Sequence, residues 1–164
     1  MQQFTSNFSA GLLQLVLLLG FLVPAVLFLL TQQNTLRLIQ PLNRTMRPGQ
    51  IWLQLIPLFG IFYQFSVVSR ISNSLQREFN SYFNDSDSIL PDQAPIGARD
   101  GKRPTWSAGM AYCWLFVISM VLQWLPSFIT MLTSLAALAG IVCWIVYWVQ
   151  LAGYKKKLQG LRPA

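Results

Sequence analysis

The acidic residues are the first place to look for chemistry, and the sequence has only five Asp and Glu. Three of them, Asp85, Asp87 and Asp92, form a D-x-D-x-x-x-x-D pattern. A calcium-binding loop would need further oxygen ligands, a glycine at its sharp turn and a bidentate glutamate at its twelfth position. These are missing, so the pattern predicts a solvated loop. A general acid–base pair would need Glu78 and one loop aspartate, and nothing in the sequence positions them.

Other residue types that catalyse reactions or bind metals are scarce. The chain has no histidine, which removes the commonest general base and a principal ligand of haem and zinc. Its two cysteines, Cys113 and Cys143, each lie in an apolar run and are expected to be packing residues. The sequence contains no G-x-S-x-G, P-loop, H-E-x-x-H or C-x-x-C motif. We therefore expect a protein that is not an enzyme and that holds no cofactor and no metal.

The composition is that of a membrane protein. Of the 164 residues, 54% are hydrophobic and 10% are charged, whereas soluble domains carry roughly 25% charged residues. The net charge is +7, and the Lys and Arg residues flank apolar runs. That placement favours lipid headgroups, and not nucleic acid, as their partners. The predicted fold class is an all-α polytopic membrane helical bundle with three or four transmembrane helices.

Three apolar runs predict transmembrane helices over residues 12–31, 107–126 and 132–153. A run of about 20 residues reaches roughly 30 Å as a helix, which is the thickness of the bilayer hydrocarbon. Residues 84–105 contain four of the five acidic residues and predict a cytoplasmic loop. Residues 154–164 form a basic tail. The whole chain is expected to be one integral membrane domain.

Residues 51–69 are apolar but interrupted, because Pro57 and Gly60 break the run. They form either a second transmembrane helix or a re-entrant segment with these two residues as its hinge. The re-entrant alternative puts all twelve Lys and Arg on one side of the membrane, whereas the spanning alternative divides them nine to three. Charge favours the re-entrant form, and length favours the spanning form. Both alternatives place the C-terminus in the cytoplasm.

An amphipathic helix is predicted to follow this segment and to reach residue 83. Its apolar positions recur at steps of three and four, which is the helical period. They are Phe65, Val68, Ile71 or Ser72, Leu75, Phe79 and Tyr82. The apolar stripe predicts a helix that either packs on its own protein or lies in the membrane interface.

Polar side chains inside the last two predicted helices form two possible seams. These residues are Tyr112, Ser119 and Gln123 in one helix and Cys143, Tyr147 and Gln150 in the other. Such residues more often join helices than line a conduit. No Asp, Glu, Lys or Arg lies in these helices, which disfavours an ion-coupled transporter. Lys155, Lys156 and Lys157 follow the last helix and are candidates for lipid headgroup contact.

Residues 43–79 resemble a signature of small polytopic bacterial inner-membrane proteins that form an uncharacterised family. The signature has the form W-L-x-L-I-P-L-F followed by V-V-x-R, and its matching residues here are Trp52, Pro57, Val67, Val68 and Arg70. This chain has Gly60 where such proteins often have asparagine. The resemblance implies a multi-pass protein of the bacterial cytoplasmic (inner) membrane and no known activity.

These observations favour a non-enzymatic accessory or scaffold subunit of a bacterial inner-membrane assembly. A bundle of this size buries little surface of its own, so we expect the lipid bilayer, further copies or other membrane subunits as partners. The alternatives are a small oligomeric channel or transporter and, third, an enzyme acting on lipid at the interface.

Overall fold

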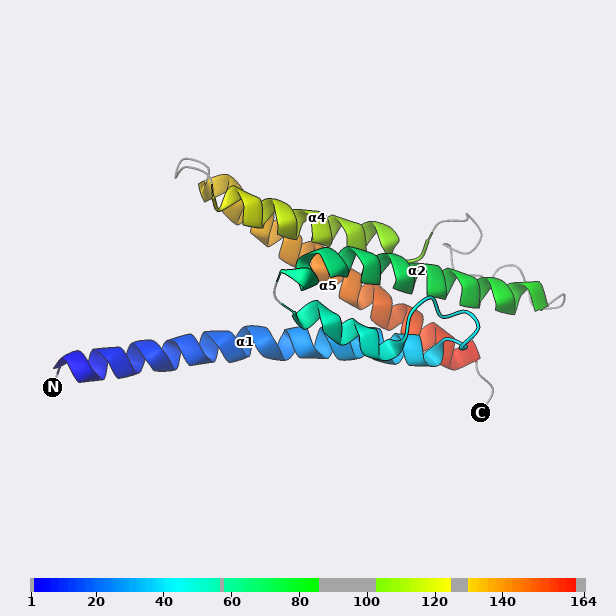
Figure 1. The fold of residues 1–164 in the computed structure, drawn as a ribbon, viewed down its shortest axis with the longest axis horizontal. Coiled ribbons are helices and arrows are strands. Elements are labelled where there is room, and N and C mark those ends of the chain that lie inside the picture. Colours follow the sequence, from blue (N-terminus) through cyan, green and yellow to red (C-terminus); the bar gives the residue numbers. More distant parts are fainter. Residues whose placement is uncertain (1, 57, 86–102, 125–129, 162–164) are drawn as a thin grey trace.

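The computed structural model describes residues 2–56, 58–85, 103–124 and 130–161. Within these residues the protein is helical and contains no strand, which confirms the predicted all-α class. Its elements are α1 (Gln2–Leu38), the 3₁₀ helix η1 (Pro48–Leu55), α2 (Phe59–Asp85), α4 (Trp106–Leu122) and α5 (Thr130–Leu161). Figure 1 shows that they lie roughly along one long axis.

Helix α1 extends beyond the predicted span at both ends. It covers Gln2–Leu38, continues through Pro24 and has a length of about 55 Å at 1.5 Å per residue. Thr31 and Thr35 remain helical, with hydroxyls that donate to the carbonyls four residues earlier at 2.8 Å. The helix ends shortly before Pro41, as expected, since residues that precede a proline avoid the helical conformation. The segment that connects α1 to η1 is therefore residues 39–47.

The interrupted segment does not form one helix over residues 51–69. η1 runs back along α1, and α2, which follows it, runs in the opposite direction (Figure 1). Leu58 adopts a left-handed conformation with φ of 63°. Gly60 is buried, and a Cβ atom there would collide with the backbone carbonyl of Gln54. The chain therefore folds back between η1 and α2, which is compatible with the re-entrant alternative, and entry into a membrane stays a prediction. Pro57 lies outside the described residues.

The apolar stripe of α2 packs on the protein itself. Val68, Ile71 and Leu75 are completely buried, and Phe79 is nearly so. The helix contacts α4 and η1. Of the two alternatives for the amphipathic helix, intramolecular packing is the one observed.

The last two helices form a closely packed pair. α4 ends at Leu122, four residues before the predicted boundary, and α5 continues to Leu161. The predicted basic tail is therefore helical to this point, because Leu158 packs in the core and no proline occurs between Pro126 and Pro163. At Gly140 a Cβ atom would lie 3.5 Å from that of Leu115, so the small residue lets the helices approach. Residues 125–129, near the predicted connection between these helices, and most of the acidic loop lie outside the described residues.

An aromatic cluster joins α1 to the α4–α5 pair. Phe28 of α1 makes edge-on contacts with four rings, with centroid separations of 5.4–6.3 Å. The partner rings are Tyr112 of α4 and Trp144, Tyr147 and Trp148 of α5. Edge-on pairs are favoured by the ring quadrupoles. This cluster fixes where α1 crosses α5.

Burial is uneven along the long axis. Among the described side chains of α1 the first buried one is Phe28, and the exposed ones before it include Leu12, Leu13, Leu15, Val16, Leu19, Leu22, Val23 and Leu27. Helix α5 is long and apolar enough to cross a membrane over Met131–Leu161, and only 6% of its most apolar window is buried. It is the one such helix among the described residues. The remaining spans stay predictions.

The close approach at Gly60 can be tested with Gly60→Ala. The added methyl must displace the Gln54 carbonyl, so we expect a loss of about 1–3 kcal/mol in the free energy of unfolding. Gly153→Ala is the matched control, because nothing lies within 4 Å of a Cβ atom at that helical position. The control should be neutral or slightly stabilising. Thermal unfolding in mild detergent measures both, and equal midpoints for the two variants would contradict the packed turn.

Candidate functional site

The residues of the predicted polar seam do not share one surface. Tyr112, Ser119 and Tyr147 are buried and Cys143 is half-buried, whereas Gln123 and Gln150 are exposed. The Ser119 hydroxyl donates to the Phe116 carbonyl of its own helix at 2.8 Å. Within this protomer the seam does not form a continuous polar path through the described residues.

A different set of polar side chains joins η1 and α5 to α1. The Gln54 amide donates to Oε1 of Gln32 at 2.8 Å, and Nε1 of Trp52 donates to Oε1 of Gln33 at 3.2 Å. Nε1 of Trp148 donates to the Thr31 hydroxyl at 3.0 Å. Residues 31–33 of α1 thus bind two other elements. The sequence analysis missed these contacts, although a run of polar residues directly after an apolar run was a visible signal.

Glu78 of α2 accepts hydrogen bonds from the connecting segment 39–47. Its side chain is completely buried, and Oε2 accepts the backbone N–H of Gln40 at 3.0 Å and the Asn43 amide at 2.7 Å. Nearby, Thr45 donates its backbone N–H to the Ser74 hydroxyl at 3.0 Å and its own hydroxyl to the Arg70 carbonyl at 2.7 Å. Glu78 therefore positions a loop, and its second oxygen has no hydrogen-bond partner among the described residues.

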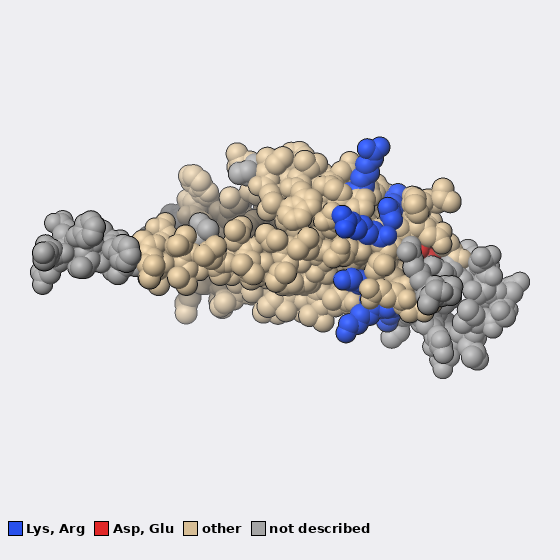
Figure 2. Space-filling view, turned by 90° about the horizontal axis from the view of Figure 1, so that it is seen from below, with Lys and Arg blue, Asp and Glu red and all other residues tan. Residues whose placement is uncertain are grey.

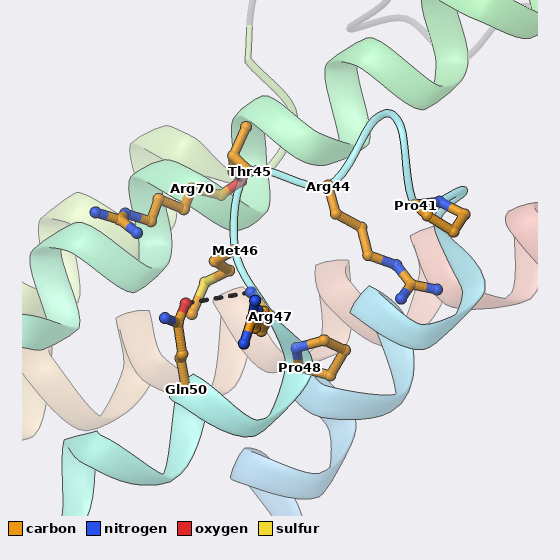
Figure 3. A pocket seen from close by; sticks show the side chains of 8 residues that line it. All are labelled: Pro41, Arg44, Thr45, Met46, Arg47, Pro48, Gln50 and Arg70. Atoms are coloured by element: carbon orange, nitrogen blue, oxygen red, sulfur yellow. Dashed lines mark hydrogen bonds between the residues drawn. The ribbon is translucent and has the colours of Figure 1, made fainter.

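Beside this loop is a pocket of about 430 Å³, which we call the arginine pocket. It is lined by Pro41, Arg44, Thr45, Met46, Arg47, Pro48, Gln50 and Arg70 (Figure 3). Arg44 is engaged at the end of α1, where its Nε donates to the Ile39 carbonyl at 2.7 Å and its Nη2 to the Arg37 carbonyl at 2.9 Å. Arg47 and Arg70 are exposed. Their guanidinium groups have no hydrogen-bond or ion-pair partner in the described part of the chain.

The lysine triplet lies at the same end of the molecule as these arginines. Lys155, Lys156 and Lys157 belong to the last turns of α5, and the Lys157 ammonium lies 5.4 Å from the centre of the Tyr154 ring. The view in Figure 2 shows Lys and Arg in a band across one half of the molecule, with a long uncharged surface beyond it. Lipid contact by the lysines stays a prediction, but their position is compatible with it.

The exposed charged groups among the described side chains are Lys and Arg, which suit the binding of anions. No group of three or more His, Cys, Asp or Glu side chains that could hold a metal occurs there. Cys113 is buried, and Cys143 is a half-buried free thiol. Comparison with family models, curated proteins and solved structures found no match for this chain.

Glu78→Ala tests whether this carboxylate holds the loop. It leaves the Gln40 N–H without its partner and the Asn43 amide with only the Ser81 hydroxyl, so we expect a loss of about 2–3 kcal/mol in the free energy of unfolding. Glu78→Gln keeps the shape and one acceptor oxygen and should lose roughly 1 kcal/mol. Limited trypsin digestion should show faster cleavage after Arg44 in the alanine variant, whereas Pro48 protects the bond after Arg47. Unchanged cleavage after Arg44 would mean that Glu78 does not position the segment.

Proposed function

We propose that this chain is a non-enzymatic accessory subunit of a bacterial inner-membrane assembly. In this proposal α1, α4 and α5 cross the bilayer, and the segment formed by η1 and α2 enters it and returns. The length and apolar surface of α5 and the exposed leucines of α1 support insertion. The band of Lys and Arg marks the cytoplasmic headgroup level, where basic residues are enriched.

The contacts of α2 support three spans over four. Four spans would put the segment 39–47 and the end of α5 on opposite sides of the membrane. Glu78 and the next residue, Phe79, instead connect the two regions: Glu78 binds Asn43, and the Phe79 ring lies 5.8 Å from the Tyr154 ring. Tyr154 directly precedes the lysine triplet. The arginines of the segment and these lysines therefore lie near one level of the long axis.

The observation that carries the accessory role is an exposed amide in α1. Gln14 is exposed and lies among exposed leucines and valines. This half of α1 extends away from α5 and has no neighbouring element in Figure 1. An amide in hydrocarbon is favourable only when it meets a polar partner, and glutamine commonly provides hydrogen bonds between membrane helices. We therefore assign this half of α1 to contact with another membrane helix, from a second copy or another subunit.

Labelling of engineered cysteines tests the topology. In intact cells, Leu42→Cys and Gln159→Cys should both resist a membrane-impermeant maleimide and should both react after permeabilisation. Both positions are exposed, and the proposal places both in the cytoplasm. The unmodified chain gives the background. A tag at the N-terminus should be accessible from outside. Labelling at position 42 alone in intact cells would establish four spans instead.

Gln14→Leu tests the assembly. Native mass spectrometry after purification in mild detergent should show the wild-type chain with a second copy or another subunit. In the leucine variant the affinity for that copy or subunit should fall about threefold to thirtyfold, which is the range for one hydrogen bond between membrane helices. Gln14→Asn should retain it in part, and Gln159→Leu, at the polar end, should retain it fully. A wild-type chain that is monomeric under these conditions would overturn the proposal.

A further inference from the structure

We propose that the arginine pocket binds the phosphodiester headgroup of an anionic phospholipid. This inference relies on the membrane placement proposed above. It does not rely on the accessory role of α1. The pocket is a defined site, which distinguishes it from general attraction between a basic surface and an acidic membrane.

The wall of the pocket is built before any ligand arrives. Thr45 is bonded to Ser74 and to the Arg70 carbonyl, and the backbone N–H of Arg47 donates to Oε1 of Gln50 at 3.2 Å. Arg44 is held by two carbonyls at the end of α1. A ligand therefore does not have to order the backbone of this segment, and this lowers the entropic cost of binding.

The charges suit an extended anion. Arginine is the residue type that best matches phosphate, because its planar guanidinium can donate two parallel hydrogen bonds. Arg47 and Arg70 are exposed on different sides of the opening, and Figure 3 shows that the three guanidinium groups spread along it and do not converge on one point. Inorganic phosphate has all its acceptor oxygens on one centre. A phospholipid has its phosphate for one guanidinium and further acceptor oxygens, on the headgroup and the glycerol esters, for a second one.

An apolar surface begins next to the pocket. Gln50 is a pocket residue near the start of η1, and Leu53, Leu55 and Ile56 further along are exposed. At about 2 Å per residue, Leu55 lies roughly 10 Å along the helix axis from Gln50. η1 runs away from the basic band toward the uncharged end (Figures 1 and 2). A lipid with its phosphate at Arg47 would thus place its acyl chains along these leucines.

The test compares two variants that lose the same charge. Arg47→Gln with Arg70→Gln removes the two free pocket cations, whereas Lys156→Gln with Lys157→Gln removes two exposed cations of α5. The full chain in detergent is titrated with phosphatidylglycerol and, separately, with phosphatidylcholine of the same acyl chains. Wild type should prefer phosphatidylglycerol. We expect the arginine variant to bind it about 30-fold more weakly and the lysine variant to change less than threefold.

Two results would contradict the proposal that the arginine pocket binds an anionic lipid. Equal losses in the two variants would show diffuse attraction, and equal binding of the two lipids by wild type would show no anion preference. In a third arm, inorganic phosphate is added in detergent without lipid. Binding of phosphate as tight as that of phosphatidylglycerol would assign the site to free phosphate and reject the lipid. Far-UV circular dichroism and the unfolding midpoint verify that both variants are folded.

The outcome is independent of the assembly experiment. Loss of lipid selectivity in the arginine variant, with a monomeric wild-type chain, would keep the pocket and reject the accessory role. If the Gln14→Leu variant loses its bound subunit and the two charge variants bind lipid equally, the accessory role is kept and the lipid pocket is rejected.

Discussion

Hydrogen bonds that Gln32 and Gln33 of α1 accept from η1 hold the returning segment in place, and the rest of the polar end depends on them. Gln54 reaches Gln32, and Trp52 reaches Gln33, so η1 stays against α1 while the chain turns at Leu58 and Gly60. Gln32 is completely buried, and a buried polar group without a partner costs about 1–3 kcal/mol. The position of η1 that brings Gln54 to Gln32 is therefore favoured. α2 then returns beside the segment 39–47, where Glu78 and Ser74 bind it.

The elements that the sequence predicted best are those with a periodic signal. The stripe of α2 at Val68, Ile71 and Leu75 is buried as its helical spacing indicates. The break near Gly60 was visible, but composition could not choose between a bent helix and a return. That choice depends on Gln54 and Gln32, which are 22 residues apart in the chain. Helix ends were placed too early in α1 and α5, because polar residues that follow an apolar run can continue a helix when they find partners.

Less of the candidate site could be predicted. The seam was inferred from helical spacing, yet Gln123 and Gln150 are exposed and point to surfaces that no other element covers within the described residues. Glu78 was considered as a possible acid catalyst, and its bonds to Gln40 and Asn43 show a positioning role. The arginine pocket joins residues 41–50 to Arg70, and only the folded-back path brings these segments together.

The position of the cations at one end has a consequence for an energised bilayer. Carrying one elementary charge across a potential of 100 mV changes its free energy by about 2.3 kcal/mol. Arg37, Arg77 and the α5 lysines would all have to cross before the molecule could invert, in addition to losing their hydration. In the proposed membrane placement, the orientation is therefore set while the chain is inserted during synthesis, and a maintained electrical gradient opposes any later inversion.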